Sequence, residues 1–164
     1  MENKFPKQIP VFPLSGVIYF PRTNLPLNIF EERYLDLVKD SFRNDKLMGI
    51  VQSKRENSLV YKVGCLGKIS DFQETSDGRV LINLTGITRF EITKEITSKK
   101  KYREFEVDYK RFYKDLITPN KVEAVYDKIN FMEKVKDFFK KNGLMINWKE
   151  FEKLDVSQKI NTLS

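Results

Sequence analysis

The chain has 164 residues, 40% of them hydrophobic, and a net charge of +7 from 30 basic and 23 acidic side chains. This length suffices for one domain with a real core, or for a domain and a small appendage. Histidine is absent and Cys65 is the only cysteine. The composition therefore excludes histidine-dependent catalysis, an intramolecular disulfide and a zinc site of the usual histidine and cysteine ligands.

The sequence also indicates where in the cell the protein resides. The first residues contain no apolar run of signal-peptide length, and no stretch approaches the roughly 20 apolar residues that span a bilayer. A single thiol in an apolar stretch fits a reducing compartment. We expect a cytoplasmic protein without membrane association.

The first predicted elements are extended segments and one helix. Pro13, Pro21 and Pro26 divide the apolar residues 9–30 into short extended pieces, whose open edges could accept a partner's backbone. Residues 31–42 place apolar side chains on one side at helical spacing, with two glutamates in the first turn, where the helix dipole favours negative charge. The pattern predicts a helix that packs over one end of a β structure.

Short strands dominate the next part of the chain. Runs rich in β-branched and aromatic residues predict strands at 47–51, 59–65, 68–72, 80–84, 90–96 and 105–109. Ser76, Asp77 and Gly78 supply the turn of a hairpin, and Gly64 and Gly67 indicate a bulge. These strands predict a small β-barrel, closed or nearly closed, with residues 80–84 as a central strand.

The pattern becomes helical after a boundary between residues 113 and 118. Thr118 and Pro119 form a helix start, and apolar residues then recur every three or four positions until Gly143. Asn147 caps a predicted short helix carrying Trp148, and another short helix ends at Leu163. The predicted fold class is α+β, mainly β, with one long helix in a C-terminal helical bundle.

No motif in the sequence supports catalysis or a cofactor. The segment from Gly64 to Ile69 has the wrong spacing for a phosphate-binding loop and no hydroxyl after its lysine. Asp71, Glu74 and Asp77 lack the spacing of a calcium loop and are interpreted as solvated residues around a turn. We expect no catalytic residue, no metal site and no cofactor.

The basic residues admit a second interpretation. Residues 99–103 and 109–113 mix lysine, arginine and aromatic side chains, as nucleic-acid stacking surfaces do. However, the positive charge is mostly dispersed lysine, and Glu104, Glu106 and Asp108 would repel phosphate nearby. An RNA-binding protein that uses the loop 99–103 is the alternative function, and nucleic-acid binding is the less favoured of the two.

Three ordered motifs carry a family resemblance: residues 13–21, residues 25–34, and residues 77–79 continuing to Gly86-Ile87-Thr88-Arg89-Phe90. In this order they resemble the N-terminal substrate-binding domain of the Lon ATP-dependent proteases, in its stand-alone bacterial form. The resemblance implies a PUA-like pseudo-barrel at residues 1–115 and a helical subdomain at 116–164. That subdomain is shorter than in stand-alone relatives, which indicates a truncated form.

The resemblance also implies a function. It predicts a non-enzymatic module that recognises unfolded or damaged polypeptides, as a substrate receptor or adaptor for an ATP-dependent protease. A homodimer through the C-terminal helical region is predicted, because a shortened bundle would expose Leu144, Ile146 and Trp148. The motifs and the apolar segment before them supply the candidate substrate-binding residues: Phe20, Pro21, Pro26, Phe30, Arg33, Tyr34, Arg89 and Phe90. For the last four, a structural role in holding the barrel and helix together is the favoured interpretation.

Overall fold

A computed structural model of the chain describes residues 5–54, 59–117, 123–143, 145 and 147–153, with the backbone alone for 123–131. The chain divides into two compact units, Met1–Leu116 and Ile117–Ser164. In chain order the elements are β1 (Gln8–Leu14), β2 (Asn24–Ile29), α1 (Glu32–Arg43), β3 (Leu47–Ser53), β4 (Val60–Glu74), β5 (Val80–Ile96), β6 (Arg103–Asp108), η1 (Lys110–Leu116), α2 (Glu123–Lys141) and α3 (Trp148–Lys153).

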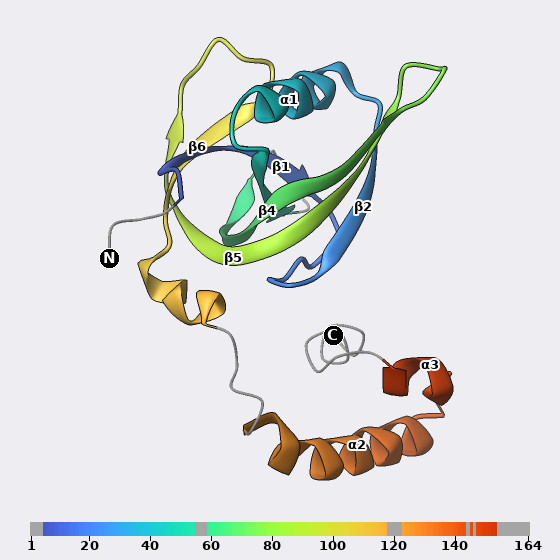
Figure 1. Cartoon of the computed structure of the whole chain (residues 1–164). Helices are drawn as coiled ribbons and strands as arrows, with labels where there is room; N and C mark the ends of the chain where they lie inside the picture. The colour runs from blue at the N-terminus through green and yellow to red at the C-terminus, as the bar shows by residue number, and fades with distance from the viewer. Residues whose placement is uncertain (1–4, 55–58, 118–122, 144, 146, 154–164) are drawn as a thin grey trace. The chain divides into compact units, whose positions relative to one another are not determined.

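The strands of the first unit form one six-stranded sheet that closes on itself (Figure 1). The strand order is β2-β5-β4-β3-β1-β6, and β6 also pairs with β5, so β1, β3, β4, β5 and β6 make a ring. β1 and β3 run parallel, and the remaining neighbours among these strands are antiparallel. The predicted mainly β architecture is confirmed.

Two long strands replace four predicted short ones. The strands predicted at 59–65 and 68–72 are one strand, β4, which begins at Val60 and whose register shifts between Leu66 and Gly67, where the sequence indicated a bulge. Residues 80–84 and 90–96 likewise belong to β5, which pairs with β2, β4 and β6 in turn. The strands continue through their glycines because the long ladder between β4 and β5 supplies backbone hydrogen bonds on both sides of each bulge.

The interior contains two clusters of buried side chains. The first lies under α1 and includes Tyr34, Leu37 and Val38 of that helix, packed with residues of the strands. The second lies within the ring of strands and contains Ile9, Val11, Val51, Leu66, Phe90, Phe105, Val107 and Tyr109. The predicted helix at 31–42 is thus present at Glu32–Arg43 and covers one end of the barrel (Figure 1).

The hairpin between β4 and β5 has the predicted turn. Gly78 adopts a φ of 81°, a left-handed conformation that glycine tolerates without steric cost. The N–H of Gly78 donates to the carbonyl of Thr75 (3.0 Å), and the Thr75 N–H donates to the carbonyl of Arg79 (2.9 Å). The turn chemistry of the sequence therefore decided this connection locally.

The second unit contains α2 and α3. The Asn147 carbonyl accepts a hydrogen bond from the N–H of Phe151 (2.9 Å), which starts α3 at the predicted residue. The Trp148 ring meets Phe139 at 5.5 Å and Phe151 at 5.8 Å between centroids. The predicted start of the long helix at 118–119 and the last predicted helix lie outside the described residues, and the bundle stays a prediction.

Within the described ranges, no helix is both long and apolar enough to cross a bilayer. The same part of the chain brings together no group of three or more acidic or cysteine side chains that could hold a metal ion.

Candidate functional site

An apolar groove of about 250 Å³ lies between the segment after β1 and the strands β3 and β4. Ile18, Tyr61 and Val63 leave 61%, 48% and 40% of their surface exposed there. Isolated apolar residues on a surface need no explanation, but apolar side chains from two separate segments that line one cavity form a binding-site candidate. The lining residues are Val17, Ile18, Tyr19, Phe20, Ile50, Gln52, Tyr61, Val63, Gly64, Cys65 and Arg89.

The outer wall of the groove is the segment between β1 and β2, here called the strap (residues 15–22). Ser15 and Ser53 share a hydrogen bond of 2.7 Å between their hydroxyl oxygens. Further along, the buried Tyr19 donates its hydroxyl to the carbonyl of Leu84 (2.9 Å). The Arg22 N–H donates to the carbonyl of Gly86 (2.8 Å). The strap is therefore fastened at both ends and in the middle, and Ile18 stays exposed.

The buried polar groups at the floor of the groove, Cys65 and Tyr19, are protonated and unreactive near neutral pH. Burial raises the pKa of the Cys65 thiol well above its ordinary value, with a further contribution from the charge of Asp115. Burial likewise raises the pKa of Tyr19. Both groups are therefore protonated near neutral pH, and a protonated thiol is a poor nucleophile. The arrangement supports binding and offers no activated nucleophile.

Arg89 closes the floor of the groove and is paired with Asp115 of η1. Its Nε and Nη2 donate to the two carboxylate oxygens at 2.9 and 2.8 Å, and its backbone N–H donates to the same carboxylate at 2.9 Å. Burial alone would raise the pKa of Asp115, but the hydrogen bonds from Arg89 outweigh it and the pKa lies below its ordinary value. The pair is therefore charged on both sides near neutrality.

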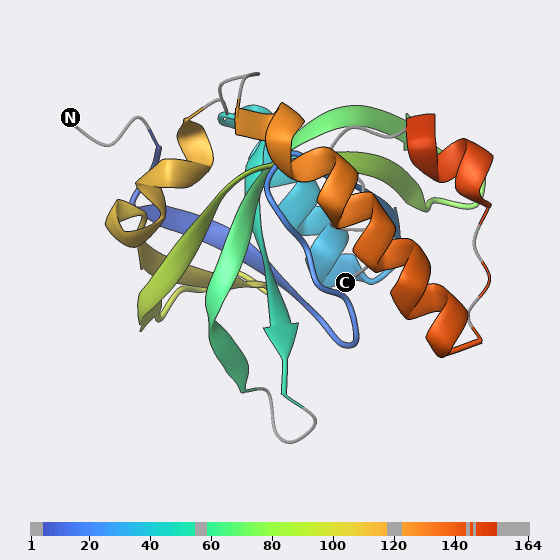
Figure 2. The same ribbon diagram turned by 90° about the horizontal axis from the view of Figure 1, so that it is seen from below.

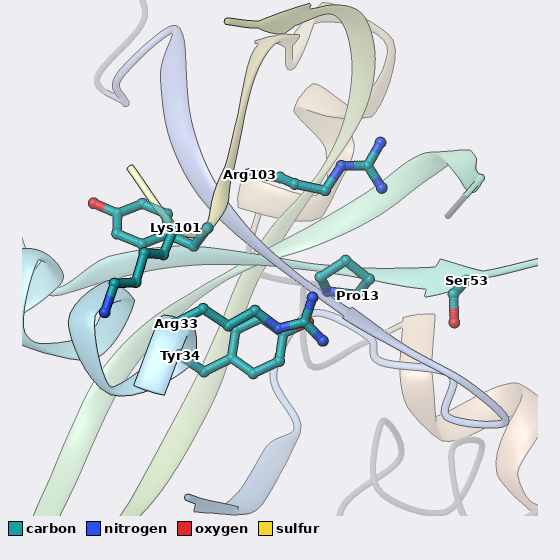
Figure 3. A pocket seen from close by; sticks show the side chains of 7 residues that line it. Pro13, Arg33, Tyr34, Ser53, Lys101 and Arg103 are labelled. Carbon is teal, nitrogen blue, oxygen red and sulfur yellow. The ribbon is translucent and has the colours of Figure 1, made fainter. Parts of the chain in front are cut away.

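A second cavity, of about 260 Å³, is basic (Figure 3). Three cationic side chains reach it from separate parts of the first unit: Arg33 from α1, Lys101 from the loop after β5, and Arg103 from β6. Pro13, Tyr34, Ser53 and Tyr102 complete its lining. Residues 101–103 of the loop 99–103 line this cavity, and this loop is the predicted RNA-binding segment of the alternative function.

Carboxylates already neutralise the basic cavity. Arg33 pairs with Glu31 at 2.8 Å, and Arg103 pairs with Glu95 at 2.6 Å. Lys101 contacts Glu32 at 3.0 Å, on α1. Such intramolecular pairs compete with any incoming phosphate, so the loop presents less free positive charge than its sequence suggests.

Tyr102 fastens the same loop to α1. Its hydroxyl donates to the Asp40 carboxylate at 2.7 Å. Burial, followed by this hydrogen bond, raises the pKa of Tyr102 to about 12. The basic loop is thus held on the acidic face of the helix.

The open edge of the sheet is β2, which among the described strands pairs with β5 alone. Leu25, Leu27 and Ile29 turn inward, and Asn24, Pro26 and Asn28 are exposed. Proline has no N–H to donate, and pairing with β5 continues on both sides of Pro26, so its missing donor lies on the outer edge. A proline at this position makes the edge a poor template for an added strand.

The predicted site residues are distributed over several places. Phe20 and Arg89 line the apolar groove, and Arg33 and Tyr34 line the basic cavity. Pro21 lies beside Gly86, Pro26 is in the edge strand, and Phe30 is 65% exposed before α1.

Phe90 is a predicted site residue whose side chain lies in the core. Its side chain is 0% exposed in the cluster inside the barrel, so no ligand reaches it in this fold. Phe90 therefore contributes to the core, which is the structural alternative to a binding role.

Sequence reasoning missed most of the groove residues, among them the apolar Val17, Ile18, Tyr61 and Val63. Tyr61 and Val63 flank Lys62 in an alternating stretch, a pattern that ordinarily places the apolar pair in a core. In the structure these two side chains are exposed and line the groove together with the strap. Their exposure depends on the path of a segment some forty residues earlier, which local periodicity cannot report.

The chain matches one protein family over most of its length. The family model of the ATP-dependent protease La (LON) substrate-binding domain matches residues 8–164. A Lon protease of Cytophaga hutchinsonii is 27% identical over 101 residues, which are 58% of this chain and 12% of that protein. Lon protease 2 of Myxococcus xanthus is 25% identical over 113 residues, 65% of this chain and 14% of that protein. The chain thus spans a small part of these relatives.

Two solved structures have the same fold. The crystal structure of a Lon N-terminal domain protein from Xanthomonas campestris matches with a TM-score of 0.55 and 28% identity, covering 62% of this chain and 59% of that one. The N-terminal domain of the Mycobacterium avium complex Lon protease matches with a TM-score of 0.58 and 13% identity, covering 84% and 70%. This chain belongs to the family of the Lon protease substrate-binding domain.

Proposed function

We propose that this protein binds exposed apolar segments of polypeptides in the groove between the strap and β4, without cutting them. The observation that carries the proposal is the pairing of Ile18 on the strap with Tyr61 and Val63 on β4, all partly exposed around one cavity. Membership of the substrate-binding domain family supports polypeptide as the ligand. Phe20 and Arg89 of the predicted site belong to this groove.

The size and chemistry of the groove fit a side chain of a polypeptide. Its volume of about 250 Å³ lies below the range of roughly 300–1,000 Å³ typical of small-molecule and cofactor sites. Burying one bulky apolar side chain contributes about 1.5–3 kcal/mol, which is enough for weak binding that several such contacts can strengthen. Unfolded chains offer these side chains, and folded proteins hide them.

The finer assignment is a PUA-like pseudo-barrel followed by a helical bundle, acting in the cytoplasm as a substrate receptor or adaptor for an ATP-dependent protease. Closure of the ring through β5 and β6 supports the barrel, and α2 and α3 support the helical part. The protease partner rests on the curated relatives, which are named Lon proteases.

Fluorescence anisotropy of a labelled, chemically unfolded polypeptide, measured from low to high salt, tests the function. Capture of apolar side chains is expected to change little with salt. The same titration with a single-stranded RNA tests the alternative at residues 99–103, because binding through phosphates weakens by orders of magnitude as salt rises. Salt-sensitive RNA binding with no polypeptide signal would replace the proposal by the alternative.

A pair of double variants locates the surface. Ile18→Ser with Val63→Ser is expected to weaken polypeptide binding about tenfold or more, since each loses part of a buried apolar contact. The matched control is Tyr113→Ser with Leu81→Ser, because Tyr113 (58%) and Leu81 (38%) are about as exposed as Ile18 (61%) and Val63 (40%) but lie outside the groove. Equal losses in both variants would place binding elsewhere.

A homodimer through the C-terminal unit is a further part of the proposal. Phe138 and Met145 expose 57% and 98% of their surface there. Of the residues on which the dimer was predicted, Trp148 is partly buried among its own neighbours, and Leu144 and Ile146 lie outside the described residues. Light scattering over rising concentration is expected to show twice the monomer mass, with Phe138→Ser shifting it toward the monomer. A constant monomer mass contradicts the dimer.

A further inference from the structure

The Arg89 side chain takes part both in the apolar groove and in the ion pair with Asp115. It lines the apolar groove and is 43% exposed, while the carboxylate that it binds, Asp115, is 9% exposed. The guanidinium group donates from Nε and Nη2 to Asp115 in the two-pronged geometry that gives arginine pairs their strength. Asp115 is therefore enclosed by protein, whereas part of the Arg89 side chain is exposed in the groove.

Asp115 in turn fastens η1, the last element of the first unit. Arg22 donates from Nη2 to the Asp115 carbonyl (3.1 Å), and the Arg89 guanidinium lies 4.7 Å from the centre of the Phe112 ring. η1 lies against β5 (Figure 2), and the first unit ends at Leu116, one residue after Asp115. The Arg89–Asp115 pair thus holds the segment by which the chain leaves the barrel.

The strength of such a pair depends on what covers it. Water over the exposed side of a guanidinium screens its attraction to a carboxylate, and an apolar group that displaces this water increases the attraction. A second carboxylate at the same place instead competes for the donors. The occupant of the groove is therefore able to change the pair in either direction, according to its charge.

We propose that Arg89 is a specificity-determining residue of the groove and that it transmits the charge of the bound side chain to η1. An apolar side chain over Arg89 tightens the bond to Asp115 and steadies η1. An acidic side chain draws the guanidinium away and loosens η1. The proposal rests on the proposed function, because it takes the groove as the polypeptide site, and linkage requires that the state of η1 also alters affinity.

Hydrogen exchange of the full chain tests the coupling. Two short unstructured peptides that differ only in one central residue, Phe or Glu, are each added to saturation as judged by anisotropy. The reporters are the amides of η1, among them Phe112, which donates to the Tyr109 carbonyl (2.9 Å). Exchange at η1 is expected to slow about fivefold with the Phe peptide and to quicken with the Glu peptide, a change at the low end of measured couplings.

Variants show whether the pair carries the effect. In Asp115→Asn the charge is lost with little change in shape, and the difference between the two peptides at η1 is expected to disappear. The matched control is Glu95→Gln, which removes the charge from another two-pronged arginine pair, Arg103 with Glu95, which lies outside the groove. This control is expected to leave the difference intact. The wild-type comparison decides the inference even if Asp115→Asn folds poorly.

The outcomes separate the two proposals. If the wild-type protein binds neither peptide, the groove is not a polypeptide site and both proposals fall. If it binds the Phe peptide in the groove but exchange at η1 is the same with both peptides, the coupling falls and the proposed function stands. If Glu95→Gln abolishes the difference as Asp115→Asn does, the effect is a general response to charge and Arg89 has no special role.

Discussion

Replacing Phe90 with alanine is expected to lower the free energy of unfolding by about 3–5 kcal/mol, the range for removal of a buried aromatic ring. The Phe90 side chain is 0% exposed and meets the Tyr109 ring edge-on at 6.5 Å between centroids. Its ring also lies beside Gly49 and Gly64, which have no side chains to fill the cavity that the substitution leaves. Urea unfolding followed by far-ultraviolet circular dichroism measures the loss.

The control for this substitution is Phe30→Ala. Phe30 is 65% exposed, so its truncation should change the stability by no more than about 0.5 kcal/mol. A Phe90→Ala variant as stable as Phe30→Ala would contradict the packed interior of the barrel. It would also reopen Phe90 as a binding residue, because a dispensable ring is free to contact a ligand.

Replacing Gly86 with alanine is expected to destabilise the protein by about 3 kcal/mol and to abolish binding in the groove. A Cβ atom at position 86 would overlap the backbone carbonyl oxygen of Phe20, and a backbone atom cannot rotate away as a side chain can. The Gly86 N–H and carbonyl also bond to Thr23 and Arg22, so β5 and the strap must move together or separate. Thermal unfolding and polypeptide anisotropy measure the two effects.

Gly78→Asn is the matched control for Gly86→Ala. Open space surrounds Gly78, and asparagine tolerates the left-handed conformation that this turn requires. The control should cost less than about 1 kcal/mol and leave binding unchanged. If Gly86→Ala binds polypeptide with full affinity while remaining folded, the strap does not form the wall of the site.

These two positions connect the sequence motifs to the fold. Residues 13–21 and 86–90 are separate motifs in the sequence, and the structure brings them together where the strap crosses β5 at Gly86. Arg89, three residues further along β5, reaches both the groove and η1. One strand therefore supplies a close approach, a groove residue and a core residue within five positions, because alternate side chains of a strand point to opposite faces.

The local sequence determined the helices and turns of this protein, but not which of these elements contact one another. The helix at Glu32–Arg43, the hairpin turn at Gly78 and the start of α3 after Asn147 follow from caps, turn residues and periodicity, which act over a few neighbouring residues. The absence of histidine and the single cysteine limit the chemistry of the chain whatever fold it adopts. The family followed from the order of three motifs.

Only the tertiary structure decided which side chains share a site. The groove joins Ile18 to Val63 across forty-five residues of sequence, Asp115 reaches Arg89, and the acidic partners of the loop at 99–103 come in part from α1. Such pairings arise from the closure of the barrel, whose contacts are long-range and leave no periodic signal in the residues they join. Phe90 and Phe20 are both aromatic residues in sequence motifs, yet Phe90 lies in the core and Phe20 lines the surface groove. Only the closure of the barrel distinguishes them.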